Sequence, residues 1–168
     1  MWTMPHKSVT RIGITGHRNI PADVRGEIEA RVREILMGDG GSGLTGVGSL
    51  AAGADQLFAS CVLELGGALE VVVPCQGYEK TFGNAEERAT YETALAVASS
   101  VERLEYPAPS EEAYMAAGAY VADRCDRLIA VWDGRPAQGL GGTGDVVRYA
   151  HGIGRDVVVV WPDGVQRA

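Results

Sequence analysis

The sequence predicts an α/β fold in which a mainly parallel sheet is flanked by helices. Strand-like and helix-like segments alternate along the 168 residues, which is typical of chains built from right-handed parallel crossovers. The last strand-like run, 157–161, is almost continuously apolar, as expected for a strand buried on both faces. Glycine-rich loops join several strands to the helices that follow them. Together these observations predict a doubly wound, Rossmann-like sheet with ligands at the carboxyl ends of its strands.

Six segments are predicted to be strands because they are apolar, rich in β-branched residues and bounded by turn-forming residues. They cover residues 9–15, 44–50, 70–74, 101–106, 127–132 and 156–161. Pro74 ends the third strand, because proline has no backbone N–H to donate to a neighbouring strand.

Helices are predicted in the intervals between the strands, over about 21–37, 54–65, 86–99, 110–125 and 143–151. Pro21 suits the first turn of the first helix, and the glycines in 38–43 break that helix. The second helix has the clearest pattern, because its apolar residues form one continuous stripe that ends at a pair of glycines. Ser110 can cap the exposed amides of the fourth helix.

The composition indicates one globular domain over residues 1–168. Hydrophobic residues make up 46% and charged residues 22%, and no linker or low-complexity tract divides the chain. No apolar run is long enough to cross a bilayer and the N-terminus lacks a signal-peptide core, so we expect a cytoplasmic protein without a membrane partner. The formal charge of −7 argues against a general nucleic-acid binder, so we expect no nucleic-acid partner.

The cysteines and histidines do not have the spacing of a metal site. Cys61, Cys75 and Cys125 contain no Cys-x-x-Cys pair and fit reduced, buried thiols. The histidines, at positions 6, 17 and 151, are scattered. We therefore expect no metal and no cofactor, and a small molecule as the partner.

The loop after the first predicted strand is a candidate phosphate site. Gly16 permits a tight turn there, and His17 and Arg18 project from the carboxyl end of the strand. The guanidinium of Arg18 offers a planar fork of donors that suits phosphate. The alternative is a surface turn with two solvated polar residues.

The loop after the second predicted strand precedes the strongest amphipathic helix. Gly53 and Ala54 are small enough for a ligand to approach the backbone, and the helix start supplies amides for an anion. Asp55 either contacts the ligand or only complements the helix dipole.

A third glycine-rich loop follows the fifth predicted strand. Gly141 and Gly142 precede a helix, and Thr143 could bind a phosphate or cap that helix. Asp133 ends the strand, where a carboxylate could contact a ribose hydroxyl or simply form a turn. Tyr78, in the loop after the third strand, could stack on a base or belong to a small aromatic cluster.

Three motifs resemble the SLOG superfamily, and they read Gly13-Ile-Thr-Gly-His-Arg18, Gly48-Ser-Leu-Ala-Ala-Gly-Ala-Asp55 and Gly141-Gly-Thr-Gly-Asp145. That group includes YspA/YpsA-like proteins, the DNA-processing protein A and the LOG phosphoribohydrolases. The likeness extends over nearly the whole chain. It implies a Rossmann-like fold that binds nucleotides or nucleotide-derived ligands, and it allows a homo-oligomer.

The sequence leaves open whether the chain is an enzyme. The resemblance implies either a sensor or accessory protein for a nucleotide-derived phosphate ligand, or an N-glycosidic hydrolase or ribosyltransferase. LOG enzymes have glutamates in the loop where this sequence has Asp145, and they have a proline that is absent here. If the chain is an enzyme, Asp145 and Arg18 are the expected catalytic residues. A third possibility is a structural or partner-binding domain whose crevice holds no ligand.

Overall fold

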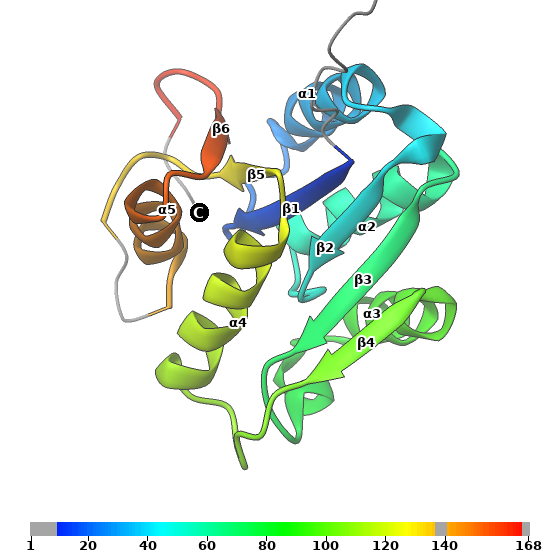
Figure 1. Cartoon of the computed structure of the whole chain (residues 1–168), viewed down its shortest axis with the longest axis vertical. Helices are drawn as coiled ribbons and strands as arrows, with labels where there is room; N and C mark the ends of the chain where they lie inside the picture. Colours follow the sequence, from blue (N-terminus) through cyan, green and yellow to red (C-terminus); the bar gives the residue numbers. More distant parts are fainter. Residues whose placement is uncertain (1–9, 137–140, 166–168) are drawn as a thin grey trace, which may run out of the picture.

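The computed structural model describes residues 10–136 and 141–165, and within them it contains a six-stranded sheet whose strands are all parallel (Figure 1). The strands are β1 (Arg11–Gly16), β2 (Thr45–Gly48), β3 (Ala68–Val73), β4 (Ser100–Arg103), β5 (Arg127–Val131) and β6 (Asp156–Val160). Their order across the sheet is β4-β3-β2-β1-β5-β6. The predicted doubly wound α/β fold is therefore confirmed.

Helices cover both faces of this sheet. In the described part of the chain they are α1 (Arg25–Gly38), α2 (Ala54–Glu64), α3 (Ala85–Val97), α4 (Glu111–Arg124) and α5 (Thr143–Gly152), with short 3-10 turns η1 (Gly41–Gly43) and η2 (Tyr78–Thr81). The first three helices lie behind the sheet in Figure 1, and α4 and α5 lie in front of it. None of these helices is long and apolar enough to span a membrane.

The path of the chain determines where a ligand can bind. From β1 the chain moves outward through β2 and β3 to β4, and then α4 brings it back to the other side of β1, where β5 and β6 follow. The connections from β1 and β5 therefore leave toward opposite faces of the sheet. In doubly wound folds this reversal opens a crevice at the carboxyl ends of the two strands.

A close contact between β1 and α4 brings that helix over the crevice. A Cβ atom at Gly13 would lie 2.8 Å from Val121 Cγ1 and 2.9 Å from Cys125 Sγ, so only glycine allows this approach. The prediction of buried, unpaired cysteines is confirmed, because Cys61, Cys75 and Cys125 are free thiols with at most 4% of their surface exposed.

Two local predictions differ from the structure. The apolar run in β6 was expected to be buried on both faces, but β6 is an edge strand and Val159 is 49% exposed, so that prediction is wrong. Apolar sequence alone does not distinguish an edge strand from a central one. Pro21 also lies outside α1, which begins at Arg25; its carbonyl accepts the Val24 N–H at 3.1 Å in a turn before the helix.

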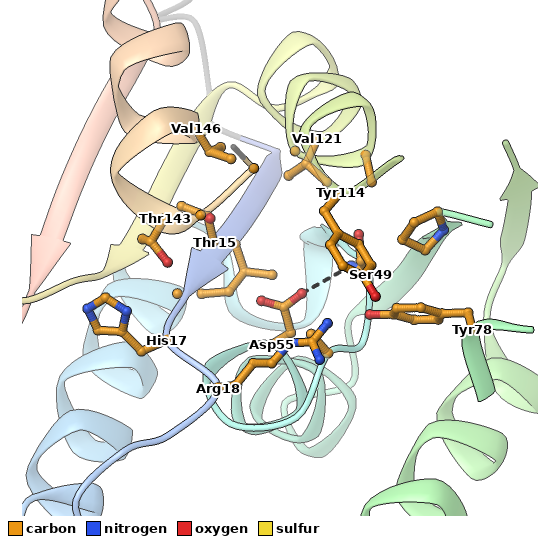
Figure 2. Close-up of a pocket in the computed structure, with 18 residues that line it drawn as sticks. Thr15, His17, Arg18, Ser49, Asp55, Tyr78, Tyr114, Val121, Thr143 and Val146 are labelled. Atoms are coloured by element: carbon orange, nitrogen blue, oxygen red, sulfur yellow. Dashed lines mark hydrogen bonds between the residues drawn. The ribbon is translucent and has the colours of Figure 1, made fainter. Parts of the chain in front are cut away.

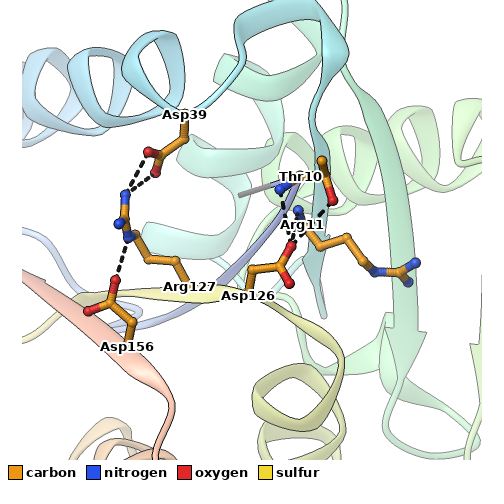
Figure 3. A network of polar contacts seen from close by, with 6 residues as sticks. All are labelled: Thr10, Arg11, Asp39, Asp126, Arg127 and Asp156. Atoms are coloured by element: carbon orange, nitrogen blue, oxygen red, sulfur yellow. Dashed lines mark hydrogen bonds and ion pairs between the residues drawn. The ribbon is translucent and has the colours of Figure 1, made fainter. Parts of the chain in front are cut away.

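A polar network joins the amino ends of three strands, at the edge of the sheet opposite the crevice (Figure 3). The Asp126 carboxylate accepts the Arg11 N–H at 3.0 Å. The Arg127 guanidinium bridges Asp39, at 2.6 Å, and Asp156, at 2.7 Å. These contacts connect β1, β5, β6 and the end of α1, so they stabilise the amino ends of the strands, away from the crevice.

Candidate functional site

A cavity of about 350 Å³ opens at the carboxyl ends of the central strands (Figure 2). Most of the predicted ligand-binding residues line it, namely Gly16, His17, Arg18, Asp55, Tyr78, Gly141, Gly142 and Thr143. The three predicted loops, which are far apart in the sequence, thus border one cavity. Gly53, Ala54, Asp133 and Asp145 do not line it.

The loop after β1 lies close against the start of α2 because two glycines remove side chains between them. A Cβ atom at Gly16 would lie 2.4 Å from Ala54 Cβ, and one at Gly53 would lie 2.3 Å from the Arg18 carbonyl oxygen. Gly53 also has a φ of +80°, a conformation that side chains disfavour. The Ala54 N–H donates to the His17 carbonyl at 3.1 Å. Gly53 and Ala54 therefore shape the site by supporting the first loop from behind.

His17 is fixed in the cavity wall by contacts on its buried side. The Asp133 N–H donates to His17 Nε2 at 3.1 Å, and Asp133 Oδ1 lies 3.2 Å from the same nitrogen. The ring also packs edge-on against Trp161 at 5.3 Å between centroids. The Asp133 side chain is fully buried and also accepts the Arg135 N–H. It therefore helps to hold His17 in place and does not face the cavity, where a ribose contact was one of its predicted roles.

Asp55 is a buried carboxylate in the first turn of α2 that faces the cavity. Only 7% of the residue is exposed, and its Oδ2 accepts the Ser49 N–H at 3.4 Å. Burial raises the pKa of Asp55 from 3.8 to about 7; the amides of Ser49 and Ala51 and the charge of Arg18 oppose this rise in pKa. A titratable group of this kind in a cavity is a common mark of a functional site.

The turn between β2 and α2 has an unusual backbone. Leu50 has a φ of +59°, although it is not glycine, and its side chain is buried. Such conformations cost about 1–3 kcal/mol and cluster at binding sites. Here the turn aims the amides of Ser49 and Ala51 at the Asp55 carboxylate.

Arg18 and Tyr114 form the mouth of the cavity. Arg18 is exposed, and its guanidinium carbon lies 5.2 Å from the centroid of the Tyr114 ring, a cation–π distance. Figure 2 shows the guanidinium beside the Asp55 carboxylate. The arginine is thus held against an aromatic ring that lines the same cavity.

Tyr78 contacts the cavity through its edge. It is 1% exposed, and its ring packs against Phe82, Tyr91 and Tyr114 at centroid distances of 5.5, 5.6 and 6.4 Å. Figure 2 shows its hydroxyl directed toward the cavity. Of the two alternatives for this residue, the structure favours the aromatic cluster, and burial raises the pKa of its hydroxyl.

The start of α5 forms the wall opposite α2. Thr143 is the first helical residue and is 8% exposed, so the first amides of the helix and the positive end of its dipole lie at the cavity. The Asp145 carboxylate accepts the Gly141 N–H at 3.3 Å and lies 3.7 Å from Arg148. Asp145 therefore stabilises its own loop and does not reach the cavity.

Sequence reasoning missed the wall that α4 contributes. Tyr114, Ala117, Gly118 and Val121 all line the cavity, whereas no residue of this helix was among the predicted ligand-binding residues. The small residues were a usable signal. A Cβ at Gly118 would lie 2.4 Å from Val146 Cγ2, so glycine there brings α4 and α5 together at the site.

Comparison with known proteins identifies the fold. The chain matches no family model and no curated protein by sequence. Among solved structures it resembles DNA processing protein A from Streptococcus pneumoniae, with 18% identity and a TM-score of 0.65 over 94% of this chain and 52% of that one. DNA processing protein A from Helicobacter pylori gives 16% identity and a TM-score of 0.65 over 95% and 69% of the two chains. This chain has the fold of these proteins.

A molybdenum cofactor binding protein from Rippkaea orientalis has a similar fold. The identity is 14% and the TM-score 0.56, over 92% of this chain and 77% of that one. The chain spans about half of the Streptococcus protein. At these identities the comparisons confirm the fold that the motifs predicted, and they leave the ligand to the geometry of the site.

The expectation of no nucleic-acid partner is wrong. The Helicobacter protein, which shares this fold, has a single-stranded DNA binding mode. The expectation rested on the formal charge of −7, which averages over the whole surface. The cavity combines Arg18 with the start of a helix, and such a local arrangement attracts anions whatever the net charge.

Proposed function

We propose that the chain binds a nucleotide or nucleotide-derived ligand through its phosphate in the cavity between β1 and α5. The observation that supports this most strongly is that an exposed arginine and a helix start border the same cavity of about 350 Å³. Ligand pockets typically enclose about 300–1,000 Å³. The combination is suited to an anion attached to a larger organic group.

The phosphate is assigned to Arg18 and the start of α5. Arg18 lies over Tyr114 and takes no part in the ion pairs found among the described residues, so its donors are available to a ligand. Backbone amides at a helix start, such as that at Thr143, bind phosphate well. The Tyr114 ring provides a flat surface on which a base can stack.

Binding measurements with separated parts of a nucleotide test this assignment. We expect AMP to bind more tightly than adenosine, and Arg18→Gln to weaken AMP binding by about 10- to 100-fold, as for a lost hydrogen bond to a charged group. Adenosine binding should change little. Arg31→Gln is the matched control, because Arg31 is an exposed arginine on α1 that does not line this cavity. A single-stranded oligonucleotide belongs in the same series, since the Helicobacter protein binds single-stranded DNA. Equal affinities for AMP and adenosine would contradict the assignment.

A second candidate function is hydrolysis of an N-glycosidic bond. The observation that favours it is the buried Asp55 carboxylate, whose pKa of about 7 suits proton transfer near neutral pH. Asp55 then replaces Asp145 as the reacting carboxylate. Release of free base from nucleoside monophosphates tests this function. Release that is lost in Asp55→Asn and retained in Asp145→Asn supports it, and no release from any of the common nucleoside monophosphates eliminates it.

A further inference from the structure

The cavity has two chemically different sides. One side carries hydrogen-bond donors, namely the first amides of α5, and the Arg18 guanidinium lies between the two sides, beside Asp55. The other side carries the buried carboxylate of Asp55, which is an acceptor when it is ionised. Figure 2 shows this carboxylate pointing into the space between Thr15, Arg18 and Tyr114. A ligand must satisfy both sides.

The Asp55 side of the cavity is closed to phosphate. The amides of Ser49 and Ala51, which an anion would need there, already serve the carboxylate. The Ala54 N–H is also occupied, because it donates to the His17 carbonyl. A phosphate in contact with Asp55 would bring a second negative charge against a buried carboxylate, where solvent screens the repulsion little. The phosphate is therefore confined to the start of α5 and to the donors of Arg18 that point away from Asp55.

The same carboxylate needs donors from the ligand. A carboxylate offers about four lone-pair positions, and the two amides of its own turn fill only part of them. Arg18 and Tyr78 interact electrostatically with this carboxylate, and Tyr114 packs against Tyr78. A sugar hydroxyl donates to a carboxylate without bringing a charge, and charge-assisted hydrogen bonds of this kind are strong.

We propose that Asp55 accepts hydrogen bonds from the ribose hydroxyls of the ligand and makes the site selective for ribonucleotides over deoxyribonucleotides. This inference rests on the proposed function, because it needs a nucleotide with its phosphate at Arg18 and α5. It adds the sugar as the part of the ligand that the site recognises. A site built around a buried acceptor rejects an analogue without the donor, because the carboxylate is then left buried without its partner.

Affinities for AMP and its deoxy analogues test the inference. The wild-type protein is titrated by calorimetry with AMP, 2′-deoxy-AMP, 3′-deoxy-AMP and inorganic phosphate at pH 8, where Asp55 is mostly ionised. We expect at least one deoxy analogue to bind about 10-fold or more weakly than AMP, as for the loss of a charge-assisted hydrogen bond. Equal affinities for all three nucleotides would overturn the inference and leave the proposed function standing. Failure of every nucleotide to bind would overturn both.

Two variants separate recognition from a merely structural role. Asp55→Asn keeps the shape of the side chain but removes the charge, so the preference for AMP should fall to within about 3-fold while inorganic phosphate binds more tightly. Asp123→Asn is the control, because Asp123 is an exposed aspartate at the end of α4 that does not line the cavity. It should retain the wild-type preference. An unchanged preference in Asp55→Asn would contradict the inference. If that variant does not fold, the wild-type ratio decides.

Discussion

Replacing Asp55 by asparagine should change how the free energy of unfolding depends on pH, because burial raises the pKa of this carboxylate. The pKa of Asp55 is raised from 3.8 to about 7 in the folded chain. Between these values the folded protein holds a proton that the unfolded chain has released, so unfolding releases it and the folded state loses stability as pH rises. The stabilising contribution is complete below pH 3.8 and has disappeared once the pH exceeds about 7.

The size of the effect follows from the shift. One pKa unit corresponds to about 1.4 kcal/mol, so the whole shift corresponds to about 4 kcal/mol, of which about 3 kcal/mol develops between pH 5 and pH 8. Asparagine does not titrate in this range. The free energy of unfolding of Asp55→Asn should therefore rise by about 3 kcal/mol relative to wild type between these two pH values.

Urea denaturation of both proteins at half-unit pH steps measures this difference. Subtracting one curve from the other removes the contributions of all other carboxylates, which are common to the two proteins. A constant difference from pH 5 to pH 8 would refute the reasoning. It would mean that the Asp55 carboxylate ionises in the folded protein as easily as in water, and that the cavity is wetter than its burial indicates.

Three further substitutions test the elements that position the site. Gly53→Ala should lower the free energy of unfolding by more than about 2 kcal/mol in denaturant titrations. The added Cβ atom would lie 2.3 Å from the Arg18 carbonyl oxygen, and the φ of Gly53 is +80°. An unchanged midpoint would show that the loop after β1 does not rest on this glycine. Ser110→Ala removes the side chain that caps α4, so thermal unfolding should show a loss of about 1 kcal/mol, with Ser110→Asp as the variant that restores it. Arg127→Met should cost about 1–3 kcal/mol at low salt and less at 1 M salt, because it breaks two ion pairs at the amino ends of the strands; a loss independent of salt would assign the effect to packing.

The elements of this fold could be predicted from sequence because their signals are local. The apolar stripe of α2 and the glycines after it required no knowledge of the sheet, and the structure places that helix at Ala54–Glu64. The Ser110 cap was equally local, and its side chain accepts the Ala113 N–H at 3.0 Å. The place of β6 at the edge of the sheet was not local, since it depends on the order of all the strands.

The loops that form the site could be predicted from sequence, but the contacts that each residue makes within them could not. Asp133 and His17 are 116 positions apart, and no sequence pattern reveals that they contact each other. Gly53 was expected to leave room for a ligand, yet the atoms that its missing side chain would meet are backbone atoms of His17 and Arg18. Such contacts depend on the crossover that brings distant loops to one edge of the sheet.

The net charge was the least informative signal, and the structure explains why. Many of the basic side chains are paired with carboxylates away from the cavity, as Arg127 is with Asp156 and Arg33 is with Glu64. Pairs of this kind cancel locally and leave the remaining acidic side chains to dominate the total. Arg18 instead lies over an aromatic ring at the cavity that the positive end of α5 also borders. The choice of ligand therefore depends on a few groups at one edge of the sheet. If Arg18→Gln left the affinity for AMP unchanged, the electrostatic field of Arg18 would not be what selects the ligand.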